Sequence, residues 1–360
     1  MRILVHEFAS GGGLAGQEVP ASLDREGAAM LRVLLEDLAA IGRHRLVTTA
    51  DTRFPLAAPA GVEVVTLSPG DPGRLDALMA SADAVWLVAP ETGRCLERLA
   101  ARAERQGAAL LGPGPAAIRR ASDKGGLPRR LGRRGVRCPP TRVLGRGADG
   151  AEWRAAARKV GYPVVVKPRR GAGSVGVSLA RDGRELGRAI EFARQVGAAG
   201  ALLLQAFMPG VAASVSLLAD GRRAMALAVN SQSVAASPRF CYRGGTTPLE
   251  HPLAGLAADT AVRACEALPG LRGYVGVDLV LTDREAVVIE VNPRLTTAYL
   301  GVRASLGGNI AVLALAACVG TLPAPPAPGR RVRFSAGGRI VSATPVGSGL
   351  ARSGVQVLPG

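Results

Sequence analysis

The sequence predicts an α/β protein, α+β in its later part, in which a Rossmann-like parallel sheet comes first. Over residues 1–115, short apolar segments alternate with helical ones, an order typical of a parallel sheet with crossover helices. Later in the chain, residues 274–281 and 286–291 are apolar runs separated by a short polar turn, which predicts an antiparallel hairpin. The chain of 360 residues has room for about two to three domains.

The elements of the first region follow from the spacing of its apolar residues. The expected strands are residues 2–5, 45–49, 62–67, 84–88 and 109–111. Helical spacing predicts a long helix through Leu31, Leu34, Leu35, Leu38 and Ile41, and shorter helices at 75–80 and 92–106. Because these strands and helices alternate, we expect the strands to be parallel.

From Pro113 onward the pattern changes, which predicts a domain boundary near residue 115. Helices are expected within 114–135 and at 153–160, 185–195, 259–267 and 309–319, and further strands at 162–166, 201–207 and 213–218. Residues 231–250 are rich in polar residues and glycine and are expected to be mostly loop. The predicted regions are an N-terminal α/β domain at 1–115, a central lid at 116–204, a C-terminal unit with a metal site at 205–322, and a proline-rich linker and tail at 323–360.

Composition limits the classes of protein that fit. The apolar run at residues 310–319 is too short to span a bilayer, and the N-terminus does not resemble a signal peptide. Five cysteines without CxxC spacing predict free thiols in a reducing cytoplasm. The net charge of +17 would suit nucleic acid, but the arginines are spread along the chain and aromatics make up only 3%. We expect no nucleic-acid or membrane partner, and small anionic ligands instead.

A glycine-rich loop follows one expected strand. Lys167 ends the strand, and the loop after it contains Gly171, Gly173, Ser174 and Gly176. Glycines let backbone N–H groups approach a phosphate, and a lysine adds a compact positive charge. The alternative is a glycine-rich hairpin turn with a solvated basic rim. The chain has only three lysines, and two of them, Lys167 and the lysine of SDKGG, lie in such contexts, which favours phosphate binding.

The late hairpin carries two acids and an amide. Glu290 and Asn292 share a face because side chains alternate along a strand, and a three-residue turn centred on Arg284 would place Asp278 opposite Glu290. These oxygen ligands suit Mg²⁺, and Arg294 is placed to stabilise a transferring phosphoryl group. The alternative is an exposed hairpin with a wet polar face. We favour the metal site because these acids interrupt apolar runs, and unpaired buried carboxylates are costly.

The loop after the first strand is less specific. Gly11, Gly13 and Gly16 match G-x-G-x-x-G, the pattern of a dinucleotide site. Five residues separate the strand from the first glycine, and the first acidic strand end, Asp51, comes too late for a ribose contact. A substrate loop in which Glu7 holds an ammonium group and a plain surface loop both fit.

Together these motifs resemble the ATP-grasp superfamily. The matching stretches are SDK at 122–124, GVRCPPT at 135–141, VVVKPRRGAGSVGV at 164–177, QAFMPG at 205–210, GVDLVL at 276–281 and IEVNPR at 289–294, in the order and roughly the spacing of that family. No protein-kinase or P-loop motif is present. The resemblance covers about residues 1–320 and implies an ATP-grasp fold preceded by a pre-ATP-grasp domain.

The resemblance also implies roles for individual residues. Phosphate contacts fall to Lys124, Lys167 and the loop Gly171, Gly173, Ser174 and Gly176; adenine contacts to Gln205, Phe207 and Met208; Mg²⁺, with Mn²⁺ as an alternative, to Asp278, Glu290 and Asn292; and phosphoryl stabilisation to Arg294 with Lys167. Members of the family carry two acids for ribose where this chain has Gln205 and Ala213. Weaker or altered nucleotide binding would follow.

The implied reaction activates a carboxylate with ATP to an acyl phosphate, which an amine attacks to give an amide, ADP and phosphate. The stretches HEFASGGG, QAFMPGVAASVSLL and NPRLTTAYLG are most similar to the tyramine–glutamate ligases of methanofuran-type cofactor synthesis. That resemblance implies L-glutamate as the acid and tyramine or a related amine as the nucleophile. The candidate substrate contacts are then Glu7, Tyr242, Arg243 and Thr296. It also implies that a homodimer is compatible with the chain.

Two other functions stay open at this point. The missing ribose acids would suit a non-catalytic nucleotide-binding or regulatory protein. The three glycines near the N-terminus would suit a nicotinamide-dependent oxidoreductase.

Overall fold

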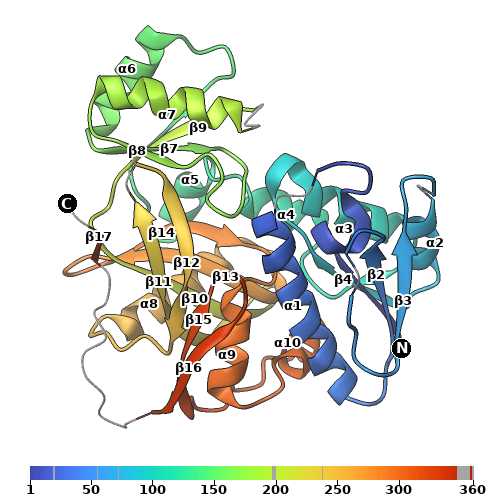
Figure 1. Ribbon diagram of the computed structural model, residues 1–360. Helices are drawn as coiled ribbons and strands as arrows, with labels where there is room; N and C mark the ends of the chain where they lie inside the picture. The colour runs from blue at the N-terminus through green and yellow to red at the C-terminus, as the bar shows by residue number, and fades with distance from the viewer. Residues whose placement is uncertain are drawn as a thin grey trace.

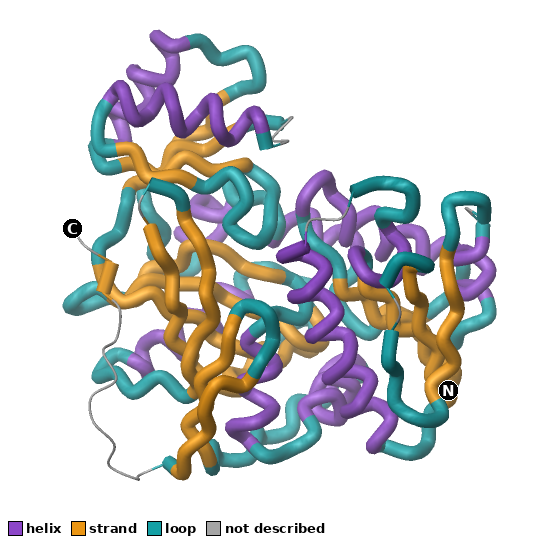
Figure 2. Tube along the Cα trace, viewed as in Figure 1, coloured by secondary structure: helices purple, strands orange, loops and turns teal. Residues whose placement is uncertain are grey.

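The computed structural model describes residues 1–18, 21–54, 56–71, 73–196, 200–236, 238–346 and 357–358. Its strands form three sheets, and helices cover them (Figures 1 and 2). A small sheet with two helices stands apart from the rest in Figure 1, above the ends of the strands of a large antiparallel sheet. A parallel sheet built from the start of the chain lies beside the large sheet.

The first sheet is parallel, as predicted. Its order is β3-β2-β1-β4-β5. The strands are β1 (Arg2–Glu7), β2 (Arg45–Asp51), β3 (Val62–Leu67), β4 (Ala84–Val88) and β5 (Ala109–Leu110), and the helices are α1 (Ala21–Ala40), α2 (Arg74–Ala80) and α3 (Cys95–Arg105). Ile3 and Val5 pack with the apolar side of α1, while Leu4 packs with α2 and α3 on the other face. Alternation along a strand explains the two faces.

The small sheet has the order β6-β9-β7-β8. Its strands are β6 (Thr141–Leu144), β7 (Val164–Pro168), β8 (Ser178–Ala180) and β9 (Leu202–Ala206), and one apolar core joins them to α6 (Gly150–Val160) and α7 (Gly183–Gln195). The helix α6 begins in a capping box in which Asp149 and Glu152 satisfy each other's backbone N–H groups. Two short helices, α4 (Pro115–Ala121) and α5 (Leu127–Gly132), connect this sheet to the parallel one.

The large sheet has the order β14-β13-β10-β11-β12-β15-β16, and β17 pairs with β10. Its strands are β10 (Gly210–Asp220), β11 (Ala224–Ala236), β12 (Phe240–Thr247), β13 (Arg272–Leu281), β14 (Ala286–Asn292), β15 (Arg330–Ser335), β16 (Ile340–Pro345) and β17 (Val357–Leu358), with α8 (Ala254–Glu266), α9 (Ala298–Leu306) and α10 (Ile310–Cys318). One core contains α8 with α4 and α5, and another joins α9 and α10 to α1. Asp37 of α1 accepts a hydrogen bond of 2.6 Å from the Tyr299 hydroxyl of α9. The helix α1 therefore fixes the parallel sheet against the large one.

One prediction was wrong in this region, and one helix was missed. Residues 231–250, expected to be mostly loop, form the end of β11 and all of β12. The polar residues that suggested a loop alternate along strands, and Gly244 and Gly245 are needed because a Cβ there would lie 2.0 Å from the Phe334 oxygen and 2.2 Å from the Ser231 oxygen of the neighbouring strands. The helix α9 was missed, although Tyr299 and Val302 share the helical spacing of its buried face.

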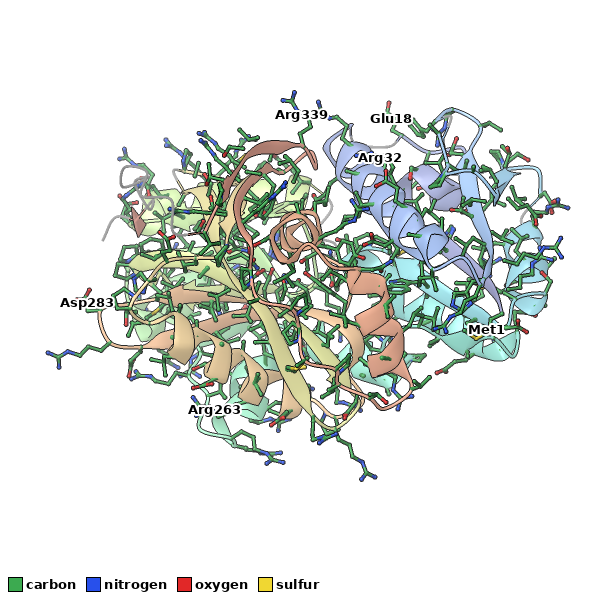
Figure 3. All side chains as sticks on the ribbon, turned by 90° about the horizontal axis from the view of Figure 1, so that it is seen from below. Met1, Glu18, Arg32, Arg263, Asp283 and Arg339 are labelled. Atoms are coloured by element: carbon green, nitrogen blue, oxygen red, sulfur yellow. The ribbon has the colours of Figure 1, made fainter. Side chains whose placement is uncertain are left out.

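Arginines project from separate parts of the surface (Figure 3), and the cysteines, all in the described ranges, form no disulfides. Figure 3 shows Arg263 and Arg339 projecting from well-separated parts of the surface. All five cysteines are free thiols. Within the described ranges no single helix is long and apolar enough to cross a membrane; α9 and α10, bent by 110° at a short break, pass that test only as a pair.

A buried histidine in the first sheet makes stability depend on pH. Burial, assisted by Arg102, lowers the pKa of His6 from 6.5 to about 4. The unfolded chain takes up a proton between these values and the folded chain does not, so the stabilisation is complete above pH 6.5 and is lost as the pH falls toward 4. We expect the free energy of unfolding to fall by up to about 3 kcal/mol across that window because of this group.

Urea unfolding at pH 7 and pH 5 measures this effect. His6→Gln should lose this part of the pH dependence, and His251→Gln, which removes an imidazole elsewhere in the chain, should keep it. An equal pH dependence in wild type and His6→Gln would show that His6 does not contribute.

Candidate functional site

The hairpin β13–β14 brings its two acids together. Asp278 lies opposite Glu290 in the antiparallel register, as predicted. The turn is longer than the three residues expected, because Leu281 pairs with Ala286, and a bulge after Asp278 restores the register. The bulged residue, Ile289, faces an apolar cluster at the hinge between the small and large sheets.

The carboxylates share a compact hydrogen-bonded group. Asp278 accepts hydrogen bonds from the Gln232 amide at 2.9 Å and from the Asn292 amide at 3.0 Å. Burial and the adjacent Glu290 raise the pKa of Asp278. Burial opposes ionisation of Glu290 too, but Lys124 and Lys167 outweigh burial and lower its pKa. The two acids therefore lie close together in a buried site, and the positive charges of Lys124 and Lys167 offset their negative charge. Sequence reasoning missed Gln232 because it lies in the stretch expected to be loop.

Both predicted phosphate-binding lysines face these acids. The Lys124 ammonium pairs with Glu290 and donates to the Gly171 carbonyl oxygen at 2.8 Å. Lys167 is buried, and burial, with a smaller contribution from Lys124, lowers its pKa to about 8 although Glu290 and Asp278 oppose this. Four groups from three parts of the chain thus form one charged cluster between the small sheet and the large sheet.

The glycine-rich loop joins β7 to β8 at the edge of this cluster. Gly173, Ser174 and Gly176 have positive φ angles of 66°, 58° and 73°, a conformation that glycine adopts easily and serine adopts at a cost. Arg169 at the loop start binds Asp123 with two hydrogen bonds of 2.7 and 3.0 Å. The loop is a hairpin connection, as one alternative proposed, but Lys124 contacts it and so places it over the charged cluster.

A small apolar cluster, the hinge cluster, lies beside the charged cluster. It is formed by Ala212, Val280, Phe207, Met208, Val234, Ala236 and Ile289. The Phe207 N–H donates to the Pro163 oxygen at 3.0 Å, while the Met208 N–H has no hydrogen-bond partner in the described part of the chain. Gln205 donates to the Thr141 hydroxyl at 3.0 Å. Ala213 packs into the opposite core, so Ala212, one residue earlier, is the residue that faces the hinge cluster.

Arg294 binds an acid that the sequence analysis did not select. Its guanidinium donates to both oxygens of Glu91, at 3.0 and 3.2 Å. Burial works against the charged guanidinium, but Glu91, with Glu26 and Glu290, outweighs it and raises the pKa of Arg294. Glu91 follows β4, and an acid directly after a buried parallel strand is the sequence feature that could have identified it, since such strand ends form sites.

We expect Glu91→Ala to lower the free energy of unfolding by about 3–5 kcal/mol, because it leaves the guanidinium of Arg294 buried without its partner. The side chains of this pair are only 12% and 4% exposed. The matched control is Glu285→Ala, which breaks the ion pair to Arg137, with side chains 42% and 70% exposed, and should cost less than about 1 kcal/mol. Equal losses in urea unfolding would contradict the prediction.

Of the predicted substrate contacts on the large sheet, only some lie near the charged cluster. Tyr242 is half-buried, and burial, then the nearby Glu26 and Asp278, raises its pKa. The Thr296 hydroxyl lies 3.5 Å from that of Tyr274 beside the same region. Arg243, the neighbour of Tyr242 on β12, is exposed.

Glu7 lies behind the glycines that follow β1. It accepts hydrogen bonds from the backbone and hydroxyl of Ser10, at 2.6 and 2.7 Å. The glycines form a π-helical turn, η1 (Ala9–Gly13), which ends well before α1 begins at Ala21. A dinucleotide fingerprint requires its glycines to open the helix. This arrangement contradicts the oxidoreductase alternative.

The donor set suits a hard divalent cation. Among the described residues, no three His, Cys, Asp or Glu side chains form a metal-binding group. The candidate set is therefore Asp278 and Glu290, with the Asn292 amide oxygen, since its nitrogen donates to Asp278. Oxygen donors of this kind, completed by substrate phosphates, are those that Mg²⁺ prefers. A cation here would relieve the repulsion that raises the pKa of Asp278.

Comparison with known proteins identifies the family. An ATP-grasp domain model matches residues 121–298, and a pre ATP-grasp 3 domain model matches residues 44–118. The tyramine–L-glutamate ligase of Methanocaldococcus fervens is 36% identical over 101 residues, which are 28% of this chain and 33% of that protein. The chain therefore matches about a third of the length of that relative.

Two longer matches cover more of the chain. The D-alanine–D-alanine ligase of Syntrophotalea carbinolica is 30% identical over 187 residues, 50% of this chain and 58% of that protein. The crystal structure of an ATP-grasp superfamily protein from Archaeoglobus fulgidus has a TM-score of 0.67 at 26% identity and covers 92% of both chains. The chain belongs to the ATP-grasp family, with a pre-ATP-grasp domain ahead of its ATP-grasp domain.

Proposed function

We propose that the protein is an ATP- and Mg²⁺-dependent carboxylate–amine ligase. The observation that supports this most directly is the charged cluster, in which Lys124 and Lys167 face the paired acids Asp278 and Glu290 under the glycine-rich loop. Lysines and loop N–H groups suit phosphates, and the acids suit a cation shared with them. The hinge cluster next to the charged cluster offers an apolar surface for adenine, and the unpaired Met208 N–H is a donor for it.

The residues of the chain then have distinct tasks. Lys124 and Lys167 hold the phosphates of ATP, and the substrate carboxylate attacks the terminal phosphorus, releasing ADP and forming an acyl phosphate. Arg294 stabilises the negative charge that develops on the phosphoryl oxygens. The amine then attacks the acyl carbon, so that the amide forms and phosphate leaves. Asp278, Glu290 and Asn292 would hold Mg²⁺, which neutralises phosphate charge when bound.

For the substrates we propose L-glutamate and tyramine or a related amine. The support is the match to tyramine–L-glutamate ligases over part of the chain. The acid Glu26 acts electrostatically on both the half-buried Tyr242 and Arg294, so an amine could pair with Glu26 and a carboxylate with Arg294. On this proposal the product enters cofactor synthesis in the cytoplasm.

Phosphate release from purified protein with Mg-ATP, L-glutamate and a small panel of amines tests the proposal. We expect release only when acid and amine are both present, and mass spectrometry should detect the amide. Release with another pair would keep the ligase and discard these substrates. Phosphate release that is equally fast without the acid and the amine would contradict ligation.

A nucleotide-binding protein without turnover is the second candidate. It rests on the ribose position, where Gln205 is hydrogen-bonded to Thr141 and Ala212 faces the hinge cluster, so that neither residue offers a carboxylate. Calorimetry showing ATP binding, together with no phosphate release across the panel, would favour it.

A further inference from the structure

A second cavity lies in the N-terminal domain, away from the charged cluster. It has a volume of about 510 Å³ and is enclosed by the ends of β1 and β3, the turn η1, α2 and α3. None of Lys124, Lys167, Asp278, Glu290 or Arg294 lines it. Its size falls within the range of small-molecule sites, which is about 300–1,000 Å³.

The position of the cavity in the sheet is one that favours ligands. The chain leaves β1 toward β2 and β3 on one side and resumes with β4 and β5 on the other. Ligands of open α/β sheets bind outside the carboxyl ends of the strands at such a reversal. His6 and Phe8 at the end of β1, and Cys95 and Arg98 of the helix that follows β4, line the cavity.

Its lining is strongly basic on one side. Arg98, Arg102 and Arg105 line it from α3, and their spacing of four and three residues places them on one face of that helix. Arg102 also pairs with Asp76, and Asp71 is the acid that lines the cavity. Positive charge exceeds negative charge at this wall, and guanidinium groups match carboxylate and phosphate oxygens in geometry.

A buried polar atom of the lining is unsatisfied. The His6 side chain is fully buried, its Nδ1 lies 2.8 Å from the Thr49 hydroxyl, and its Nε2 has no hydrogen-bond partner among the described residues. Buried polar atoms nearly always have a hydrogen-bond partner, so an unpaired one indicates a position for a ligand atom or a water molecule. The lowered pKa keeps this imidazole neutral, so Nε2–H can donate when Nδ1 accepts from Thr49.

The glycines of the first loop shape the cavity. Gly12 has a φ of 90°, and a Cβ there would lie 2.7 Å from the Cβ of Leu67. At Gly13 a Cβ would lie 2.2 Å from the ring of Phe8. Side chains at these positions would collide with the wall, so the glycine-rich stretch that resembled a dinucleotide motif has a structural task at the rim of this cavity.

We propose that this cavity is a binding site for a small anion bearing a carboxylate or a phosphate, held by Arg98 and Arg105 with His6 at the buried end. The site is separate from the charged cluster, so the proposal stands whether or not the ligase proposal holds. Carboxylate and phosphate share the oxyanion chemistry recognised here, and binding experiments distinguish them.

Isothermal titration calorimetry of the full chain with inorganic phosphate and, separately, with L-glutamate tests the proposal. Mg²⁺ and a non-hydrolysable ATP analogue are present at saturating concentration, so that the charged cluster is already occupied. We expect one saturable site per chain for at least one anion that depends on Arg98 and Arg105, in addition to any L-glutamate bound at the substrate site proposed above. The tighter of the two identifies the class of ligand. The absence of saturable binding of both anions would overturn the proposal.

Matched variants locate the binding. Arg98→Gln/Arg105→Gln should weaken it at least about tenfold. Arg129→Gln/Arg133→Gln changes the net charge equally at two exposed arginines around α5 and should leave the affinity unchanged. Circular dichroism melting verifies that both variants are folded. Equal affinities in the two variants would place the anion elsewhere and overturn the assignment.

Discussion

Lys167→Met is expected to reduce ATP-dependent ADP formation by about 10²–10³-fold, because it removes a buried cation from the charged cluster proposed to bind the phosphates of ATP. The same substitution should leave the free energy of unfolding unchanged or raise it. Burial lowers the pKa of Lys167 to about 8, which shows that the folded protein holds this ammonium at a cost. Methionine has a similar length and carries no such cost. A large loss of turnover in an equally stable protein would separate function from folding.

The chain offers a matched control for this substitution. Lys159 is exposed on α6, and Lys159→Met changes the net charge equally. Steady-state kinetics should find it close to wild type. Turnover in Lys167→Met within a few-fold of that control would contradict the role of Lys167 in catalysis. A variant that is inactive because it is unfolded would contradict the stability expected for it.

The hairpin shows how far local reasoning reaches. Two apolar runs, a short turn and strict alternation were enough to predict that Asp278 faces Glu290, and the register is confirmed. The predicted turn was shorter than the real one, and the bulge after Asp278 compensated for the difference. A bulge responds to the packing of neighbouring strands, here the contacts of Ile289 at the hinge, which the hairpin sequence alone does not contain.

Contacts between distant segments were the part that the sequence could not supply. Glu91 and Arg294 are 203 residues apart, and Lys124, in the connection between α4 and α5, meets Glu290 of β14. The alternation rule identifies which residues share a face of one strand, but it carries no information on which strand ends meet. The error at residues 231–250 has the same origin. Gln232 and Tyr242 are polar because they face the site, and polarity without its context predicted a loop.

Ribose recognition illustrates an error of a single residue. The resemblance assigned the missing acid to Ala213, but Ala213 packs into the core and Ala212 faces the hinge cluster. A shift of one residue along a strand exchanges its faces. Both residues are alanines, so the expectation of altered nucleotide binding persists, and Ala212→Glu is the substitution that would restore an acid on the correct face.

Glu290→Gln is expected to lower kcat/KM for Mg-ATP by about 10²–10³-fold, since it removes a charged oxygen from the proposed cation site while keeping the shape of the side chain. Glu285→Gln, at the turn of the same hairpin and paired with Arg137, is the matched control and should be near wild type. Activity of Glu290→Gln close to that control would contradict the metal site.

A double-mutant cycle with Lys124→Met decides how Glu290 acts, because Lys124 pairs with Glu290 and also donates to the Gly171 oxygen. If Glu290 served only to position Lys124, the double variant would be no worse than Lys124→Met alone. If Glu290 holds the cation while Lys124 binds phosphate, the two losses should approach additivity, and raising the Mg²⁺ concentration should partly restore Glu290→Gln but not Lys124→Met. We expect the second result, since the acid lies in register with Asp278 and not merely beside a lysine.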